Sequence, residues 1–346
     1  MSIIVMVDKG ELDLDTPDSR PIGGAESAFI DLAKQLALRG HSVIVQTRCQ
    51  NRHRVGNLDW LPFEVPVDRL VDGVIALRDP GLFARYQVKR KKKILWLPNT
   101  GRYLLKPEKF YKMLVERPAM VFLGAYHATT YPKWAPSGRR VIIPYGISDP
   151  FRTATEQSIP PPPVAVFLSN PLRSLDWLLD VWGGEIHPKM PAAELHVYSG
   201  PQTYGRYGEL VAAKMAPVLH KAASMSDSGV QLRSPLPRHQ LAETFRTSRV
   251  LLYRGDYAET FCLAVGETQA MGVPCVLQDY GSVGERIVNG QTGYLAKDDR
   301  DFAERALQLL RDDELWLRCH RACLDRYQPD WNEVAGQFEA IIQSHE

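Results

Sequence analysis

Four consecutive prolines, Pro160 to Pro163, divide this chain of 346 residues into two parts with the same rhythm. A proline run is stiff and extended, which is typical of a linker. On both sides of it, short and wholly apolar segments alternate with segments of helical periodicity. Apolar strands separated by helices predict a parallel sheet covered on both faces. We therefore predict an α/β protein with two Rossmann-like, doubly wound domains facing a central cleft.

The domain boundaries follow from the same pattern. The first domain is predicted over residues 1–155, with strands at 3–7, 41–47, 70–77, 94–97, 120–123 and 141–143. The second is predicted over 156–328, with strands at 164–168, 195–198, 229–232, 250–253 and 274–277. The last segment, 329–346, contains more helix than the second sheet needs. We expect it to cross back to the first domain.

Charge is distributed unevenly between the two parts. Residues 1–155 contain 24 Lys and Arg against 15 Asp and Glu, a net charge of +9, whereas the rest contains 18 against 25, a net charge of −7. A basic first half suggests a phosphate-bearing acceptor or an anionic membrane surface as its partner, and no nucleic acid is expected. The longest run of consecutive Lys and Arg residues is 89–93. It is equally consistent with a solvated turn and with a functional patch.

No apolar run approaches the roughly 20 residues that span a bilayer. The first residues also lack the basic region that begins a signal sequence. We therefore expect a cytoplasmic protein, with the inner face of the membrane as a candidate site of peripheral contact.

Two predicted helices begin with features suited to phosphate. Gly23 and Gly24 open the first helix, where free N–H groups and the helix dipole favour an anion. No G-x-G-x-x-G follows the first strand, which argues against an NAD enzyme. In the second domain, Asn170 and Arg173 follow the strand at 164–168. A cation at a helix start opposes the dipole, so a diphosphate is the favoured explanation, with a solvent-facing arginine as the alternative.

Glu259 and Glu267 lie eight residues apart on what we predict to be one helix, 260–271. Eight helical residues rise about 12 Å. The acid and base of a glycosidase are roughly 5–10 Å apart, so these two glutamates are not expected to flank one bond. They could instead hold the two ends of an elongated ligand, with ribose hydroxyls as the natural partner of Glu267. The alternative for Glu259 is helix capping.

In order along the chain, these motifs resemble those of the retaining GT-B glycosyltransferases of family four. The resemblance covers most of the chain and includes the E-x7-E signature, the segments at 143–147 and 173–176, and the turns at 281–285 and 289–295. It implies transfer of a sugar from a nucleoside-diphosphate sugar, with retention of configuration and neither cofactor nor metal. Asp13-Leu14-Asp15 fits a pattern for Mg²⁺, but it lies in an acidic loop, and we expect no metal site.

The resemblance also implies roles for individual residues. Glu259 would hold the donor sugar hydroxyls, and Glu267 the ribose. Arg173 would stabilise the departing diphosphate together with the turn at Gly23 and Gly24. The other donor contacts are the backbone N–H groups of Thr260, Phe261 and Cys262, with Asn170 in the loop before Arg173 and the base near Ser234.

This sequence departs from the family pattern at several positions. Cys262 replaces the usual glycine, and a second phosphate-binding cation is missing unless Arg254 replaces it. The usual histidine after the strand at 94–97 is also missing, so His127 or Asn99 would serve instead, with His127 as the catalytic candidate.

The acceptor is expected to be a surface glycan, a lipid-linked sugar or a small-molecule natural product. Two alternatives remain. One is a non-catalytic protein of GT-B fold that binds nucleotide sugars or acts as a scaffold. The other is a GT-B sugar epimerase, which would need further acid and base groups around the donor sugar.

Overall fold

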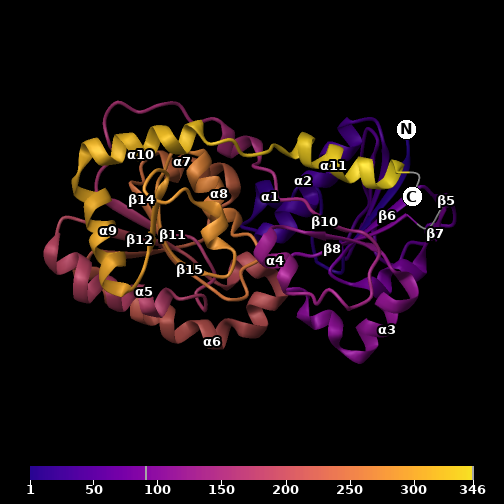
Figure 1. Cartoon of the computed structure of the whole chain (residues 1–346), viewed down its shortest axis with the longest axis horizontal. Coiled ribbons are helices and arrows are strands. Elements are labelled where there is room, and N and C mark those ends of the chain that lie inside the picture. Colours follow the sequence, from indigo (N-terminus) through magenta and orange to yellow (C-terminus); the bar gives the residue numbers. More distant parts are fainter. Residues whose placement is uncertain (90–91, 345–346) are drawn as a thin grey trace. The chain divides into compact units, whose positions relative to one another are not determined.

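The computed structural model describes residues 1–89 and 92–344 and divides into two compact units (Figure 1). Unit 1 comprises Met1–Thr16, Gly24–Gly146 and Pro329–Glu346, and unit 2 comprises Pro17–Gly23 and Ile147–Gln328. The boundary therefore falls after Gly146 rather than after residue 155. The intervening residues pack within unit 2, where Phe151 contacts Phe245 with ring centroids 5.8 Å apart.

The sheet of unit 1 is parallel except at one edge. Its strand order is β10-β9-β8-β6-β1-β2-β4-β3, and only the β3–β4 pair is antiparallel. The strands are β1 Ile3–Val7, β2 Ser42–Thr47, β3 His53–Val55, β4 Leu58–Pro62, β6 Gly73–Leu77, β8 Lys93–Trp96, β9 Ala119–Phe122 and β10 Arg140–Ile142. A separate two-stranded sheet pairs β5 Leu70–Val71 with β7 Gln87–Val88.

Helices and short 3-10 turns surround this sheet. The helices are α2 Gly24–Leu38, α3 Pro107–Glu116, α4 Ala125–Thr129 and α11 Trp331–Gln343, and 3-10 turns span Pro80–Arg85 and Gly101–Leu105. Helix α2 buries an apolar stripe formed by Phe29, Leu32, Ala33 and Leu36. The short helix α1, Thr16–Ser19, spans the point where the chain passes from unit 1 to unit 2.

The C-terminal helix α11 is part of unit 1 and packs beside α2 (Figure 1). It starts with a capping box, in which Asp330 and Glu333 exchange side-chain and backbone hydrogen bonds. Phe338 makes an edge contact with Trp96 of β8, with ring centroids 5.1 Å apart. Arg39, at the end of α2, binds Glu339 with a contact of 2.6 Å. A segment distant in sequence thus completes the core of unit 1.

The sheet of unit 2 is wholly parallel, in the order β13-β12-β11-β14-β15-β16. Its strands are β11 Val164–Phe167, β12 Glu194–Tyr198, β13 Val230–Arg233, β14 Val250–Gly255, β15 Cys275–Tyr280 and β16 Gly293–Ala296. Its helices are α5 Leu175–Val181, α6 Gly205–Ser224, α7 Arg238–Arg246, α8 Leu263–Ala270, α9 Asp299–Arg311 and α10 Asp313–Asp325. Figure 1 shows α5 and α6 on one side of the strands and α7 and α8 on the other.

Both units are therefore doubly wound α/β domains, as predicted. In unit 1 the chain moves outward from β1 through β2 to β4, and then returns to the other side of β1 with β6. In unit 2 it moves from β11 to β13 and returns to the other side of β11 with β14. The strands β3, β4, β7 and β16 had not been predicted. Within the described residues, no helix combines the length and apolarity needed to cross a membrane.

Candidate functional site

Each sheet reverses its direction of winding at one pair of adjacent parallel strands, and ligands of open α/β sheets bind outside the carboxyl ends of such strands. In unit 2 the pair is β11 and β14. The loop after β11 contains Asn170 and Arg173, and the loop after β14 contains Glu259. Two predicted site segments thus meet at the edge of the sheet where a ligand is expected.

The loop after β11 is built to present Arg173. The side chain of Asn170 accepts the N–H of Leu172 at 2.9 Å, and its carbonyl accepts the N–H of Arg173 at 2.8 Å. Ser174 then adopts a left-handed conformation with φ 63° and precedes α5. Asn170 therefore shapes the turn and fixes the position of Arg173.

Arg173 and Glu259 form an ion pair in unit 2. Arg173 Nη1 lies 2.7 Å from Glu259 Oε2, which also accepts the hydroxyl of Tyr253 at 3.1 Å. The Glu259 side chain is only 11% exposed, whereas the Arg173 side chain is 36% exposed. The Glu259 carboxylate raises the pKa of Arg173 although burial opposes this, and burial together with Glu259 raises the pKa of Tyr253. The pair keeps a charged guanidinium at the sheet edge.

The structure corrects the prediction that Glu259 and Glu267 share one helix. Helix α8 begins only at Leu263, because Cys262 has a left-handed backbone with φ 62°. Glu259 lies in the preceding loop, where its Oε1 accepts the N–H of Cys262 at 3.3 Å. The helical rise of about 12 Å therefore does not separate the two carboxylates, and Glu259 is not the N-cap residue.

Glu267, on α8, is buried beside a cation that had not been predicted. Its Oε1 accepts Arg238 Nη2 at 3.0 Å, and both side chains are about one-tenth exposed. Arg238 begins α7, contacts the hydroxyl of Ser148 and lies over the ring of Phe151 at 5.3 Å. Arg238 therefore compensates the cost of burying the Glu267 carboxylate and fixes its position.

Arg254 does not join the Arg173–Glu259 pair. Its Nε donates to Gln278 at 3.1 Å and its Nη2 to Tyr280 at 2.9 Å, and the guanidinium lies over the rings of Trp177 and Tyr280. The expected replacement for the second phosphate-binding cation is therefore engaged elsewhere in unit 2.

The other predicted donor residues are divided between the two units. Thr260 and Phe261 are buried in the loop before α8, with the guanidinium of Arg286 4.1 Å from the ring of Phe261. Ser234 is exposed after β13. Gly24 is the first residue of α2 in unit 1, whereas Gly23 belongs to unit 2.

The structure does not support a catalytic role for His127. Its side chain is fully buried, Nδ1 accepts the N–H of Leu123 at 3.0 Å, and Nε2 lies 2.8 Å from the carbonyl of Asn99. Since Nδ1 accepts a hydrogen bond, Nε2 carries the proton and donates. Burial lowers the pKa of His127 to about 4, so the ring is neutral. His127 positions the backbone of Asn99 and leaves no ring nitrogen for a ligand.

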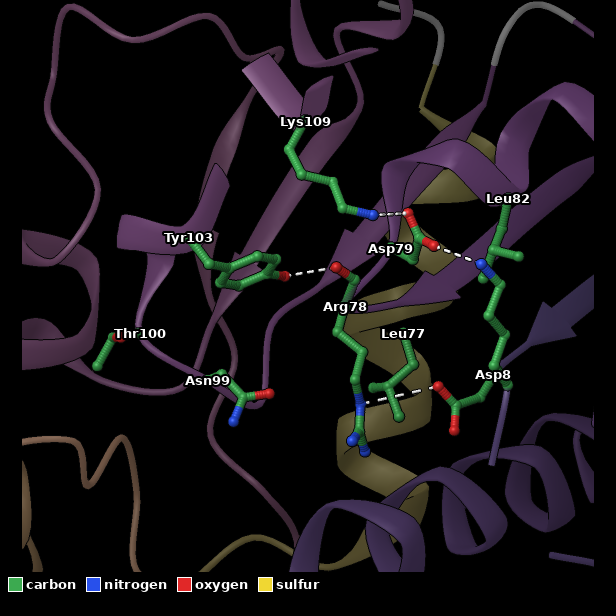
Figure 2. Close-up of a pocket in the computed structure, with 10 residues that line it drawn as sticks. Asp8, Leu77, Arg78, Asp79, Leu82, Asn99, Thr100, Tyr103 and Lys109 are labelled. Atoms are coloured by element: carbon green, nitrogen blue, oxygen red, sulfur yellow. Dashed lines mark hydrogen bonds and ion pairs between the residues drawn. The ribbon is translucent and has the colours of Figure 1, made fainter. Parts of the chain in front are cut away.

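The corresponding strand pair in unit 1, β1 and β6, borders a pocket of about 500 Å³. Asp8 and Lys9 follow β1, and Arg78 and Asp79 follow β6. The complete lining is Asp8, Lys9, Leu77, Arg78, Asp79, Leu82, Asn99, Thr100, Tyr103 and Lys109. Figure 2 shows Lys109 reaching Asp79 and Arg78 turned toward Asp8.

Arg78 has an unusual backbone at this pocket. Its φ of 58° is left-handed, which costs a non-glycine residue about 1 kcal/mol or more and is common at functional sites. Its Nη2 donates to Glu26 at 2.6 Å, its Nε lies 3.7 Å from Asp8, and the hydroxyl of Tyr103 donates to its carbonyl at 2.5 Å. Burial raises the pKa of Asp8, although the neighbouring Arg78 opposes this.

The Asp13-Leu14-Asp15 loop folds back on itself through hydrogen bonds of Asp13. Asp13 accepts the hydroxyl of Thr16 at 2.8 Å and the N–H of Asp15 at 3.2 Å, so it shapes its own turn. The part of the chain that the structure describes contains no group of three or more His, Cys, Asp or Glu arranged to hold a metal ion.

Comparison with known proteins places the sequence match within unit 2. Residues 162–312 match the family model described as glycosyl transferases group 1. N-acetyl-alpha-D-glucosaminyl L-malate synthase of Bacillus anthracis is 32% identical over 107 residues, 29% of this chain and 27% of that protein. D-inositol 3-phosphate glycosyltransferase of Streptomyces avermitilis is 33% identical over 123 residues, 34% and 26% of the two chains. The match thus spans about a quarter of each curated relative.

Solved structures match along the whole chain. Sucrose-phosphate synthase from Thermosynechococcus elongatus has a TM-score of 0.75 and 13% identity, over 99% of this chain and 98% of that one. Trehalose 6-phosphate synthase from Burkholderia multivorans has a TM-score of 0.67 and 14% identity, again over 99% and 98%. An Anabaena protein solved with UDP and glucose has a TM-score of 0.71 and 12% identity, over 98% of each chain. The chain has the GT-B fold.

Several charged or polar residues around the candidate sites of the two units had not been predicted. They are Tyr253 and Arg238 in unit 2, and Asp8, Lys9, Arg78, Asp79 and Lys109 in unit 1. A signal was present for most of them. Asp8 and Arg78 each follow an apolar strand directly, and Arg238 is a cation at a helix start, the feature that had drawn attention to Arg173.

Proposed function

We propose that this chain is a glycosyltransferase that moves a sugar from a nucleoside-diphosphate sugar to an acceptor hydroxyl with retention of configuration. The Arg173–Glu259 ion pair is the observation that carries the proposal, since it lies at the strand reversal of unit 2. Both residues fall within the stretch that matches the group 1 glycosyltransferases. The resemblance of the E-x7-E segment to retaining enzymes supports retention.

In the proposed reaction, the anomeric carbon exchanges its bond to a diphosphate oxygen for one to the acceptor oxygen, which releases a proton. Negative charge develops on the departing diphosphate. Arg173 donates one N–H to Glu259, and a guanidinium has five, so it retains donors for phosphate oxygens. Glu259 would hold hydroxyls of the donor sugar.

The remaining donor roles extend from this pair. Glu267, held by Arg238, would accept the ribose hydroxyls, and the base would lie near Ser234. The loop 260–262 would supply N–H groups to the diphosphate and sugar. We propose that no metal ion is required, because Arg173 can supply the positive charge that the leaving group needs.

Nucleotide binding is the first test. Thermal-shift measurements with UDP, GDP and ADP should raise the melting temperature for at least one of them, because a ligand of the folded state stabilises it. A panel of sugar nucleotides bearing that base should then show transfer or slow hydrolysis in the presence of a chelator. If no nucleoside diphosphate binds and no sugar nucleotide is consumed, the proposed function is wrong.

A non-catalytic nucleotide-sugar-binding protein remains the second candidate, because His127 has no free ring nitrogen. Glu259→Gln separates the two candidates. An enzyme should lose turnover by about a hundredfold or more, the usual effect of removing a charged transition-state contact, while still binding the nucleotide. Wild-type protein that binds the nucleotide but consumes no sugar nucleotide supports the second candidate.

We also propose that unit 1 contacts an anionic membrane through α3. The described cations of the run 89–93 have partners, since Lys89 pairs with Asp72 and Lys93 with Glu116; Arg90 and Lys91 lie outside the described residues. Exposed apolar residues instead lie on α3 and near it: Tyr111, Leu114, Val115 and Trp134. The same segments carry the exposed cations Lys106, Arg117 and Lys133, a combination that suits an anionic membrane surface.

Vesicle co-sedimentation tests this contact. The protein should bind phosphatidylglycerol-containing vesicles better than vesicles of phosphatidylcholine alone, and Trp134→Ser should weaken the binding. The exposed Tyr327→Ser in unit 2 provides a matched control. Equal binding of charged and neutral vesicles would contradict the proposal.

A further inference from the structure

Unit 2 contains a largely buried guanidinium that lacks hydrogen-bond acceptors. Arg286 ends the 3-10 turn Val283–Arg286, which follows β15, and only 18% of its side chain is exposed. Its Nε is buried without a hydrogen-bond partner in the described structure, as is the hydroxyl of Ser282, which immediately precedes that turn. Its Nη2 lies 3.8 Å from Glu285 Oε2, which is beyond hydrogen-bond distance. A buried charged donor without an acceptor is costly, so a ligand is the natural source of the missing acceptor.

A second guanidinium adds positive charge beside Arg286. Arg326 donates through Nη1 to the side chain of Gln269 at 2.8 Å and to the carbonyl of Arg286, and through Nη2 to the carbonyl of Glu285 at 3.3 Å. These three acceptors are neutral oxygens, so they do not compensate the charge of Arg326. Burial and the neighbouring Arg326 lower the pKa of Arg286 to about 10, although Glu285 opposes this. Arg286 therefore stays charged at neutral pH beside another cation.

Arg286 lies beside the loop that the proposed function assigns to the donor. Its guanidinium carbon is 4.1 Å from the centroid of the Phe261 ring. The turn before it is tied to the same loop, since the N–H of Ser282 donates to the carbonyl of Glu259 at 3.1 Å. Helix α8 begins after this loop at Leu263, and the first N–H groups of a helix favour an anion. A helix start and an uncompensated cation thus border one loop.

We propose that Arg286 is the second cation that binds the diphosphate of the donor, together with Arg173. The electron pair of the breaking bond to the anomeric carbon stays on the diphosphate, and the two guanidinium groups share the stabilisation of this charge. Arg254, the replacement expected from the sequence, is held by Gln278 and Tyr280 instead. The identification of the anion as the donor diphosphate rests on the proposed function. The missing acceptor of Arg286 does not depend on it.

The contribution of the diphosphate to affinity isolates this role. Calorimetric titration gives the Kd of the nucleoside diphosphate that stabilises the protein and the Kd of the corresponding nucleoside. Arg286→Met removes the charge and keeps a flexible side chain that can pack on Phe261. The nucleoside diphosphate should lose about tenfold or more in affinity, as expected for a charge-assisted hydrogen bond, and the nucleoside should bind as before. An unchanged ratio of the two Kd values would overturn the proposal.

Two further variants separate charge from packing. Arg305→Met is the matched control, because Arg305 is also an arginine of unit 2 over an aromatic ring, that of Tyr294 at 4.8 Å, but it pairs with Asp301 at 3.0 Å. It should bind the nucleoside diphosphate as wild type does. Arg286→Lys keeps the charge and should retain part of the affinity that Arg286→Met loses. An equal loss in Arg305→Met would overturn the assignment to Arg286.

A purely structural role for Arg286 predicts a different change in stability. If Arg286 only holds the ring of Phe261, Arg286→Met should lower the melting temperature of the unliganded protein. If Arg286 is a cation for a ligand, removal of its uncompensated charge should leave that temperature unchanged or raise it. The rise in melting temperature on addition of the nucleoside diphosphate should then shrink. A lower unliganded melting temperature with an unchanged rise would overturn the proposal.

The two proposals can fail separately. Inorganic pyrophosphate, which carries neither base nor sugar, should raise the melting temperature of the wild type and have less effect on Arg286→Met. Pyrophosphate binding that depends on Arg286, without binding of any nucleoside diphosphate, would keep the anion site and remove the glycosyltransferase. Sugar transfer by Arg286→Met with the wild-type kcat and the wild-type KM for the donor would keep the enzyme and remove Arg286 from its mechanism.

Discussion

An arginine pairs with a carboxylate beside the strand reversal of each unit. Arg173 pairs with Glu259 after β11 and β14, and Arg78 contacts Glu26 and Asp8 near the ends of β1 and β6. Both arginines keep their charge because carboxylates compensate the cost of burial. Each unit thus carries a cation in a fixed position at the strand reversal, where open α/β sheets bind their ligands.

The buried pair of Arg238 and Glu267 should be sensitive to loss of one partner. Arg238→Leu removes the guanidinium that compensates the buried Glu267 carboxylate and should lower the free energy of unfolding by about 3–5 kcal/mol, measured by urea denaturation. Adding Glu267→Leu removes that charge and should recover part of the loss. If the double variant is less stable than Arg238→Leu alone, the ion pair is not the cause.

Because burial lowers the pKa of His127, we expect the free energy of unfolding to depend on pH. Its folded-state pKa is about 4, below the value of about 6.5 of an unfolded histidine, so unfolding takes up a proton between these values. The stability from neutral His127 is complete above pH 6.5 and falls as the pH drops toward 4, by an amount on the order of 3 kcal/mol at most. His127→Gln should flatten this dependence in urea unfolding curves of unit 1.

A second histidine provides the comparison. His320, in unit 2, also has a pKa lowered by burial. His320→Gln should alter the pH dependence of unit 2 and leave that of unit 1 unchanged. An unaltered acid slope in His127→Gln would show that another group causes the loss of stability.

The turn into α8 depends on one left-handed residue. Cys262, with φ 62°, stops the helix from starting at residue 260 and so places Glu259 in a loop beside Arg173. The glycine that the resembled family usually has at this position adopts such a φ without strain. The left-handed backbone therefore accounts for the usual glycine, and the structure does not explain the cysteine that replaces it here.

Substitutions at Cys262 should reflect this backbone. Cys262→Val should destabilise the protein by about 2 kcal/mol, because a β-branched residue is poorly tolerated at positive φ, and should also displace Glu259 and weaken nucleotide binding. Cys262→Gly should change stability by less than about 1 kcal/mol, because relief of strain offsets lost packing. The matched control is Cys275→Val, in strand β15, where a β-branched residue fits.

The sequence predicted long, periodic elements better than turns. Most of the predicted strands are present, among them 3–7 and 250–253, and the fold class follows from these apolar strands. Strand β4 was missed because its residues, LDWLP, form neither an apolar run nor a regular alternation. For the candidate site, Arg173 and Glu259 could be named, but their contact depends on the left-handed residues Ser174 and Cys262, which no periodicity reveals.

The two units should unfold separately, and α11 should affect only one of them. Phe338 of α11 is fully buried against unit 1, where it contacts Trp96. Phe338→Ala should lower the stability of unit 1 by about 3–5 kcal/mol through the cavity it leaves, and the transition of unit 2 should not shift. Hydrogen exchange resolved by peptide distinguishes the two transitions.

Gln337→Ala, on the exposed side of the same helix, is the control for this prediction. It should change stability by no more than about 0.5 kcal/mol. Equal loss of protection in both units after Phe338→Ala would show that they unfold as one.

Unit 1 consists of three separate segments of the chain, so its last segment is translated long after its first. Helix α11 is synthesised only after the whole of residues 147–328, which takes on the order of 10–40 s at the usual elongation rates. For that time the nascent N-terminal sheet lacks the helix that contacts Trp96, and an apolar surface stays open beside the ribosome. Unit 1 is therefore the first unit to begin synthesis and the last to complete its fold. Chaperones have most opportunity to bind it during this interval.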